Sequence, residues 1–293
     1  MELQGRVKDV RDRGLGIAVI SYDSREILEA FTREHAITFP LLSDKGSETI
    51  TRYGILNTVV DEALGPNRDD PAVKADVQKY ISVNQAQPMM RGMAFPGTFI
   101  VDRQGRVTAR FFEDFYIERN TVSGILKRVA GRDATLAGTK ISTAQLDVTT
   151  YPSDASVAAG NRFALVLELA PRRGTHVYAP GASGYKVIAL TVAPQPFVRV
   201  LPLRYPASEI YFFKPLNERV PVYQKPFRLV QEVVLEGQPQ AQQAFRGKDS
   251  LTITGTLDYQ ACDDRECFNP ASVPLTWTVG LRPLVTQRPK VAQ

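Results

Sequence analysis

The sequence predicts two domains of different class, an α/β domain followed by an all-β domain. The chain has 293 residues, more than one hydrophobic core usually supports. Helical periodicity and continuous apolar runs alternate in the first part of the chain, whereas short segments of alternating apolar and polar residues fill the second. We therefore place domains at residues 1–132 and 143–284, joined by a linker at residues 133–142.

The first domain alternates helices with strands. Apolar residues at helical spacing predict helices at 1–13, 25–34, 47–53 and 118–129. Continuous apolar runs predict buried strands at 15–22 and 39–44, and a hairpin covers 95–111, with its turn at Asp102 to Gly105. A polar stretch at residues 57–92 reads as an insertion with one or two weak helices. Buried strand, helix, hairpin and helix form the C-terminal three quarters of a thioredoxin-type fold.

Residues 1–131 resemble the redoxins of the AhpC/TSA peroxiredoxin class. The resemblance rests on the segments Ala18–Asp23, Phe39–Asp44, Tyr53–Ile55 and Phe95–Asp102. It implies that Pro96 follows a cis peptide bond and lies against a reactive cysteine, where its backbone aligns an incoming thiol or disulfide. The alternative is that Pro96 only begins a strand on its exposed side.

The redoxin resemblance is incomplete at the start of the chain. The family's first strand and its W-C-P-x-C-like cysteine loop should lie within about two helical turns upstream of Glu2. Residues 1–132 contain no cysteine. We therefore expect a native chain with an earlier start, whose additional segment carries the cysteine loop and a signal peptide.

The second domain is predicted to be a β-sandwich. Alternating segments occur at residues 144–150, 162–169, 186–192, 228–235, 251–259 and 273–279. Strands at this spacing, separated by Pro and Gly turns, indicate two packed sheets. The predicted core positions are Phe163, Leu165, Leu167, Leu190, Val233, Ile253, Leu257 and Trp277.

The only two cysteines of the chain, Cys262 and Cys267, lie at the turn between the last two predicted strands. The arms of a short hairpin can bring two Cα atoms to the roughly 5.5 Å that a disulfide needs. Charged residues between the cysteines should keep at least one sulfur accessible. Spacing alone leaves open a structural staple and an exchanging disulfide. A metal site is not expected, because only His35 and His176 could complete a ligand set.

The second domain resembles the N-terminal periplasmic domain of the thiol:disulfide interchange protein DsbD. The matching segments are His176–Gly181, Gly184–Tyr185, Tyr205–Pro206, Val220–Tyr223 and Tyr259–Pro270. The resemblance implies an immunoglobulin-like sandwich in which Cys262 and Cys267 are a redox couple that receives electrons from a membrane partner.

The same resemblance implies supporting aromatic residues around the cysteines. Tyr178 and Tyr259 would flank the sulfurs, and Phe212 and Phe213 would belong to a shielding loop that also includes Tyr211. Core packing is the alternative for all of these aromatic residues. His176 is expected at the surface at a strand end, with tuning of a thiolate as its alternative role.

Composition excludes several classes of function. The net charge of +5 comes from Lys and Arg spread along the chain, which does not predict nucleic-acid binding. No apolar run reaches the roughly 18 residues needed to span a bilayer. The printed N-terminus does not look like a signal peptide. A disulfide is nevertheless typical of an oxidising compartment, so we expect a periplasmic or otherwise extracytoplasmic protein.

The sequence thus predicts a thiol-disulfide oxidoreductase that transfers electrons through Cys262 and Cys267, without a cofactor. The expected partner is a thioredoxin-like or membrane redox protein, and the redoxin domain itself is a candidate partner or substrate. Two alternatives remain: a truncated peroxiredoxin-like antioxidant peroxidase, and a non-catalytic binding module with a structural disulfide.

Overall fold

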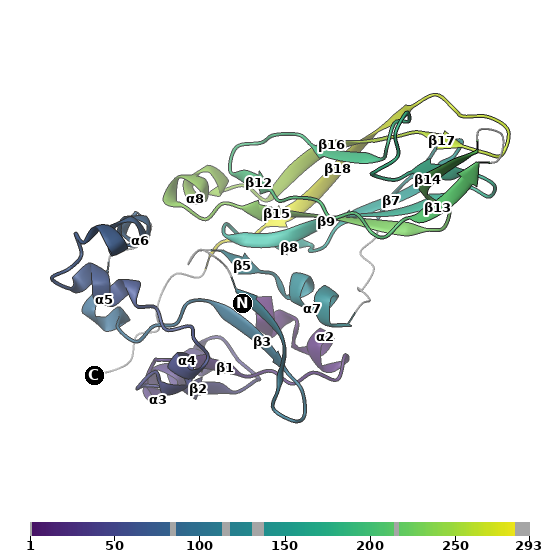
Figure 1. Cartoon of the computed structure of the whole chain (residues 1–293). Coiled ribbons are helices and arrows are strands. Elements are labelled where there is room, and N and C mark those ends of the chain that lie inside the picture. The colour runs from purple at the N-terminus through teal and green to yellow at the C-terminus, as the bar shows by residue number, and fades with distance from the viewer. Residues whose placement is uncertain (1, 83–85, 113–117, 131–137, 214–216, 285–293) are drawn as a thin grey trace. The chain divides into compact units, whose positions relative to one another are not determined.

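A computed structural model describes residues 2–82, 86–112, 118–130, 138–213 and 217–284. The chain forms two compact units (Figure 1). The first unit spans Met1–Arg132 with Gly237–Gln240 and Leu284–Gln293, and the second spans Asp133–Glu236 and Ala241–Pro283.

The first unit mixes short helices with short strands. Its helices are α1 (Glu2–Gly5), α2 (Val7–Arg11), α3 (Arg25–Glu34), α4 (Glu48–Arg52), α5 (Val59–Leu64), α6 (Pro71–Ile81), the 3-10 helix η1 (Pro88–Met90) and α7 (Val122–Ala130). Its strands are β1 (Val19–Ser21), β2 (Leu41–Ser43), β3 (Gly97–Val101), β4 (Val107–Phe112) and β5 (Arg119–Asn120). The predicted order of helices and strands is confirmed, including the two helices α5 and α6 inside the insertion.

Three predicted elements of this unit differ from the structure. The helix expected at residues 118–129 begins only at Val122, and Arg119–Asn120 form β5. The helix expected at residues 1–13 is interrupted at Arg6, which separates α1 from α2. The strand expected at residues 15–22 is only three residues long, because its parallel pairing with β2 covers Val19–Ser21 alone. The hairpin is confirmed, and the Asp102 carboxylate fixes its turn by accepting from the backbone N–H groups of Gln104 and Arg106, each at 2.9 Å.

The strands of the first unit are less buried than the sequence predicts. Ile20 of β1 is 40% exposed and Leu42 of β2 is 47% exposed. Among the described residues, β1 and β2 form one two-stranded sheet, and β3 and β4 form another. A two-stranded sheet covers little of its own surface, so the apolar residues of these strands remain partly in contact with solvent.

The expected cis peptide bond before Pro96 is not found. No peptide bond among the described residues is cis, so the Phe95–Pro96 bond is trans. The trans isomer is the intrinsically favoured form of an X–Pro bond. Pro96 itself is half-buried and comes directly before β3, as the alternative prediction of a strand start requires.

The second unit is built almost entirely from strands. One sheet has the order β12 (Val198–Val200), β15 (Phe227–Leu235), β9 (Asn161–Pro171), β7 (Leu146–Pro152) and β6 (Thr139–Ser142). A second has the order β11 (Ala189–Val192), β16 (Ser250–Tyr259), β18 (Ala271–Leu281) and β8 (Ser156–Val157). A third has the order β13 (Glu209–Phe213), β14 (Glu218–Tyr223), β10 (His176–Tyr178) and β17 (Ala261–Cys262). A short helix, α8 (Pro239–Phe245), follows β15 in the sequence.

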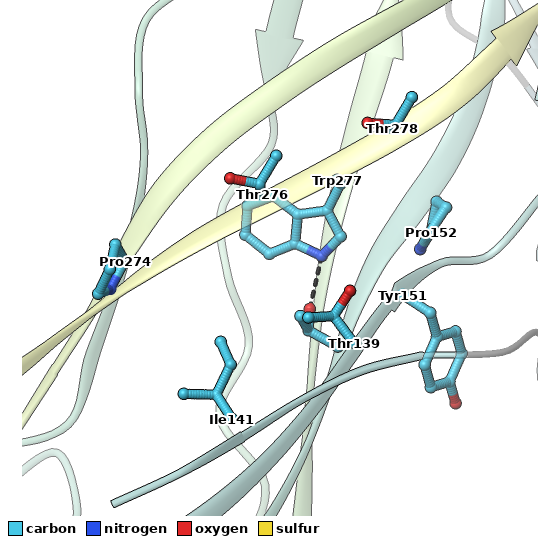
Figure 2. A pocket seen from close by; sticks show the side chains of 9 residues that line it. Thr139, Ile141, Tyr151, Pro152, Pro274, Thr276, Trp277 and Thr278 are labelled. Carbon is cyan, nitrogen blue, oxygen red and sulfur yellow. Dashed lines mark hydrogen bonds between the residues drawn. The ribbon is translucent and has the colours of Figure 1, made fainter.

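One hydrophobic core holds the second unit together. Most of its buried residues come from β7, β9 and β15 of one sheet and from β16 and β18 of another, and Val177, Tyr223 and Ala261 of the third sheet also belong to it. The predicted core positions are confirmed, except that Leu190 is only half-buried and packs against the edge of the cluster. Trp277 is 1% exposed, and its indole Nε1–H donates to Thr150 Oγ1 of the facing sheet at 2.6 Å (Figure 2). The large apolar area removed from water should stabilise this unit strongly.

Candidate functional site

The two cysteines face each other across the tip of the β16–β18 hairpin. Gln260 carries the chain from β16 into β17, which pairs with β10 instead of β18. Cys262 and Cys267 form an isolated antiparallel bridge, with Cα atoms 4.0 Å apart and a disulfide between the sulfurs. The hydrogen bonds Asp263 N to Glu266 O and Phe268 N to Ala261 O flank this bridge. The cysteines are therefore a non-hydrogen-bonded pair, the position at which opposing side chains of antiparallel strands lie closest.

The loop between the cysteines is organised by Asp263. Its Oδ1 accepts from the backbone N–H groups of Arg265 at 2.7 Å and Glu266 at 2.8 Å. The N–H of Glu266, followed by that of Arg265, lowers the pKa of the Asp263 carboxyl group. The loop is thus a tight turn that holds the Cys267 side of the hairpin in place.

The two sulfurs differ in their access to solvent. Cys262 is 2% exposed, whereas Cys267 belongs to the exposed residues of the loop. The Tyr178 hydroxyl oxygen lies 3.0 Å from Cys262 Sγ and 3.5 Å from Cys267 Sγ. Because a disulfide carries no proton, Tyr178 is the donor in both contacts. Cys267 is therefore the more exposed cysteine of the pair.

Tyr178 is a buried phenol that keeps its proton. It is 2% exposed, and burial is the largest cause that raises its pKa above the usual value, followed by the neighbouring Tyr185. The Tyr178 and Tyr185 rings stack nearly parallel with centroids 4.0 Å apart. Tyr185 O–H in turn donates to Glu218 Oε2 at 2.7 Å. A line of polar groups therefore runs from the Cys262 sulfur toward the half-exposed Glu218.

A second aromatic group, formed by His176 and Tyr211, lies close to the cysteine loop. His176 lies opposite Cys262 in the β10–β17 register. Its ring centroid is 4.4 Å from that of Tyr211 and 5.4 Å from that of Tyr178. Tyr211 O–H donates to Asp264 Oδ1 at 2.7 Å, which attaches the cysteine loop to the edge strand β13.

The expected surface position of His176 is wrong. His176 is only 3% exposed, because β10 lies between β14 and β17 in the interior of its sheet. Burial lowers the pKa of its imidazole, and the carboxylates of Asp264 and Asp263 partly oppose this effect. The imidazole is therefore neutral at neutral pH.

The other predicted supporting residues have different positions. Phe213 is half-buried and its ring lies 6.5 Å from that of Tyr211, whereas Phe212 is 42% exposed beneath the guanidinium of Arg219. Successive side chains of a strand point to opposite faces, which places Tyr211 and Phe213 together and Phe212 on the other face. The rest of the expected shielding loop, residues 214–216, lies outside the described residues. Pro96 belongs to the first unit, whereas both cysteines belong to the second.

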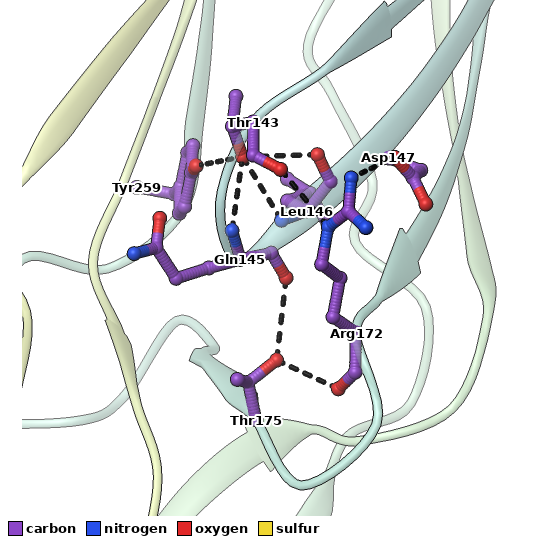
Figure 3. A network of polar contacts seen from close by, with 7 residues as sticks. All are labelled: Thr143, Gln145, Leu146, Asp147, Arg172, Thr175 and Tyr259. Atoms are coloured by element: carbon purple, nitrogen blue, oxygen red, sulfur yellow. Dashed lines mark hydrogen bonds and ion pairs between the residues drawn. The ribbon is translucent and has the colours of Figure 1, made fainter.

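Tyr259 takes part in a polar network beside the main core (Figure 3). Its hydroxyl group lies 2.7 Å from Thr143 Oγ1, which also accepts from the backbone N–H of Leu146. Arg172 donates to the carbonyl of Thr143 and pairs with Asp147. The Tyr259 hydroxyl group thus fastens the start of β7 to the end of β16, which is the packing role weighed as its alternative.

Sequence reasoning did not assign roles to Tyr185 and Glu218. Tyr185 was visible as part of the Gly184–Tyr185 segment, but no local pattern pairs it with Glu218. Their contact depends on a loop that folds back over β14, a long-range arrangement that periodicity does not report. The burial of His176 likewise depends on the order of the strands.

Two further observations concern the surroundings of the disulfide and the rest of the second unit. Among them, no group of three or more His, Cys, Asp or Glu side chains could hold a metal ion. A pocket of about 360 Å³ lies beside Trp277 and is lined by Thr, Pro, Ile, Tyr and Trp side chains of β6, β7 and β18 (Figure 2). None of these side chains is a thiol, an imidazole or a carboxylate.

Comparison with known proteins places the first unit in a defined class. Residues 1–110 match the model of the AhpC/TSA family. Residues 1–110 are therefore similar to thioredoxin-like redoxins, and this similarity suggests thiol-disulfide redox function. Curated protein sequences provide no match to the chain.

Solved structures show only weak likeness to this chain. The N-terminal periplasmic domain of ScsB from Proteus mirabilis is 13% identical, with a TM-score of 0.36; the match covers 48% of this chain and 51% of that one. The ZirS C-terminal domain is 12% identical, with a TM-score of 0.23 over 51% and 73% of the two chains. The periplasmic chaperone SfaE is 9% identical, with a TM-score of 0.21 over 47% and 59%. These scores are too low to establish a common fold.

The structure also bears on membrane association. Within the described part of the chain, no helix is long and apolar enough to cross a bilayer.

Proposed function

We propose that this protein is a thiol-disulfide oxidoreductase that transfers electrons by exchanging the Cys262–Cys267 disulfide with a partner thiol. The observation that carries the proposal is the unequal access of the two sulfurs. Cys267 is exposed, whereas Cys262 is buried beside the Tyr178 hydroxyl group. A disulfide that serves only as a staple requires no hydrogen-bond donor at its sulfurs.

The proposed reaction begins at Cys267. A partner thiolate attacks Cys267 Sγ, a partner–Cys267 disulfide forms, and the Cys262–Cys267 bond breaks with its electron pair on Cys262 Sγ. The Tyr178 O–H group donates to this developing thiolate, which stabilises charge in a buried position. Attack by the partner's second thiolate on its own bonded sulfur then releases Cys267. The partner leaves as a disulfide, and this protein takes up two protons and becomes the dithiol.

In this proposal Cys267 is the cysteine that reacts first, a point that the sequence leaves undecided. The acidic groups beside Cys267 are themselves engaged in hydrogen bonds, Asp263 with the loop backbone and Asp264 with Tyr211. We expect the partner to be a thioredoxin-like or membrane redox protein with a dithiol. The role of Pro96 in aligning a thiol concerns chemistry at the first unit. That role stays a prediction.

The proposal extends to fold and location. An immunoglobulin-like sandwich is supported by the main core of the second unit, to which two of its sheets contribute most of the buried residues. An extracytoplasmic location is supported by the disulfide itself, because thiols are kept reduced in most cytosols. Expression with and without export, followed by counting of free thiols, tests the location.

Mapping of mixed disulfides tests the proposed function. The oxidised chain is mixed with glutathione, quenched in acid, alkylated and digested. We expect the glutathione adduct on Cys267 and the alkyl group on Cys262. An adduct on Cys262 would show that the partner attacks Cys262 first, contrary to the proposed reaction. If millimolar glutathione forms no adduct, the disulfide is a staple and the non-catalytic binding module becomes the better account.

Peroxidase activity is the second candidate, because residues 1–110 match the AhpC/TSA family. The chain supplies only Cys262 and Cys267 as thiols, and both lie in the other unit. Consumption of hydrogen peroxide by the reduced chain, compared with Cys267→Ser, decides between the candidates. We expect no peroxide consumption above that of the variant.

A further inference from the structure

The buried sulfur raises a question that the exchange reaction alone does not answer. When the protein gives up electrons, the Cys262 thiol must lose a proton before it can attack a disulfide. Cys262 is 2% exposed, so water has little access to it. The Tyr178 hydroxyl group lies 3.0 Å from its sulfur.

A line of polar side chains, joined by hydrogen bonds at both ends and by a stacked pair of tyrosine rings in between, leads from this sulfur toward the surface. The Tyr178 ring stacks on Tyr185 at 4.0 Å, with an angle of 12° between the ring planes. Tyr185 O–H donates to Glu218 Oε2 at 2.7 Å. Tyr178 is buried, whereas Tyr185 and Glu218 are half-buried, so exposure to water increases along the line.

The groups on the other side of Tyr178 do not offer an equivalent route. His176 meets Tyr178 edge to face, with ring centroids 5.4 Å apart. Tyr211 directs its hydroxyl group to Asp264, at the exposed loop beside Cys267. The carboxylate that Tyr178 reaches through Tyr185 is therefore that of Glu218.

We propose that Tyr185 and Glu218 are positioning residues that move the Cys262 proton to and from solvent through the Tyr178 hydroxyl group. This inference rests on the proposed function and assigns a proton path to the same site. The phenol of Tyr178 touches the reacting sulfur, whereas Tyr185 and Glu218 act through it.

The proposed step balances as follows for the oxidation of the dithiol. The Cys262 proton passes to Tyr178 Oη, the Tyr178 proton to Tyr185 Oη, and the Tyr185 proton to the Glu218 carboxylate. The electron pair left on Cys262 Sγ attacks Cys267 Sγ of the mixed disulfide. The Cys262–Cys267 bond forms, the partner leaves as a thiolate, and Glu218 releases its proton to water. Reduction of the protein runs the same transfers in reverse.

Resolution of a glutathione adduct tests the proton path. The reduced full-length chain is loaded with glutathione on Cys267, and closure of the intramolecular disulfide is followed from pH 6 to pH 9 by acid quench and mass spectrometry. We expect Glu218→Gln and Tyr185→Phe to slow closure roughly 100-fold at pH 6, the low end of the effect of a positioned acid–base group. The difference should shrink as the pH rises toward 9, because a growing fraction of the thiol is then ionised without help from these side chains.

Two comparisons make the result decisive. Glu209→Gln removes a carboxylate on the neighbouring strand β13 that pairs with Lys225 instead of a tyrosine, and it should follow the wild type at every pH. Tyr185→Phe retains the stacked ring, so loss of packing does not explain its effect. The proton path is overturned if both variants differ from the wild type by the same factor at all pH values, or if Glu218→Gln closes faster at pH 6.

The same experiment separates failure of this inference from failure of the proposed function. If the wild-type chain forms no adduct on Cys267, the exchange function itself is wrong. If the wild-type chain forms and resolves the adduct while the pH profiles of all variants coincide, only the proton path is wrong.

Discussion

The two units of the chain contrast in how far they bury their apolar strands. In the second unit, Leu165 and Leu167 of β9 are 0% exposed. In the first unit, Ile20 and Leu42 are 40% and 47% exposed, although their strands read as equally apolar. The difference lies in the sheets, because β9 lies between two neighbouring strands and opposite a second sheet, whereas β1 and β2 pair mainly with each other.

The same two units also contrast in chemistry. The redoxin match covers residues 1–110, yet residues 1–132 contain no cysteine. Both cysteines lie in the unit with the complete core. A family match therefore does not locate the reactive group of this chain, and both stability and exchange should depend mainly on the second unit.

The largest expected effect comes from removing the exposed sulfur. Cys267→Ser should abolish exchange with dithiothreitol or glutathione, because no disulfide can form and the remaining Cys262 is buried. Quantitative alkylation after incubation measures this loss. Residual exchange in the variant would show that Cys262 is more accessible than its burial indicates.

The next effect sharpens the contrast in burial. Leu165→Ala in β9 should lower the free energy of unfolding by about 2–5 kcal/mol, because it leaves a cavity in a closed core. Leu42→Ala in β2 makes the same chemical change at a half-exposed position and should cost less than about 1 kcal/mol. Denaturant unfolding of the full chain, followed by a probe in each unit, compares the two. Equal losses of unfolding free energy in the two variants would show that the two units do not differ in how strongly they bury these leucines.

A smaller effect is expected at the hydroxyl group that meets the sulfurs. Tyr178→Phe retains the stacked ring but removes a hydrogen bond to a developing thiolate, which is worth about 1.5–3 kcal/mol. Reduction by glutathione should slow roughly 10- to 150-fold.

The matched control for this variant is Tyr223→Phe. Tyr223 donates to the carbonyl oxygen of Pro206 at 2.9 Å and lies on β14 of the same sheet. This variant should lose some stability and keep its exchange rate. If the two variants slow exchange to the same degree, the Tyr178 hydroxyl group has no special role.

The smallest effect concerns pH. Burial lowers the pKa of His176, so between that lowered value and about 6.5 the unfolded chain binds a proton that the folded chain does not. Unfolding free energy should therefore fall as the pH decreases below about 6.5, and His176→Phe should remove this part of the decrease. Asp263, whose pKa is lowered, contributes in a separate window below its ordinary value of 3.8. Identical slopes for wild type and variant between pH 7 and pH 5 would contradict the burial of His176.

The sequence predicted local structure better than it predicted which strands and side chains lie next to each other in the fold. The helix at residues 25–34, the hairpin at Asp102 to Gly105 and the core positions Leu165 and Trp277 follow from periodicity and turn chemistry. Those signals are local, so they survive in any arrangement of the sheets.

What the sequence did not predict depends on which strands become neighbours. His176 is buried because β10 pairs with β14 on one side and β17 on the other. The pairing of Tyr185 with Glu218 joins residues 33 positions apart. Ile20 remains exposed because the sheet of the first unit is split into two pairs of strands. Alternation within one strand contains none of this information.

The reduction potential of the Cys262–Cys267 pair tests the central claim most directly. The oxidised chain is equilibrated with dithiothreitol and glutathione buffers, and the fraction of dithiol is measured by alkylation and mass spectrometry. An exchanging disulfide should have a potential between roughly −270 and −120 mV, the range of known thiol-disulfide oxidoreductases. A potential below about −300 mV would contradict electron transfer through this pair and identify the disulfide as a structural staple.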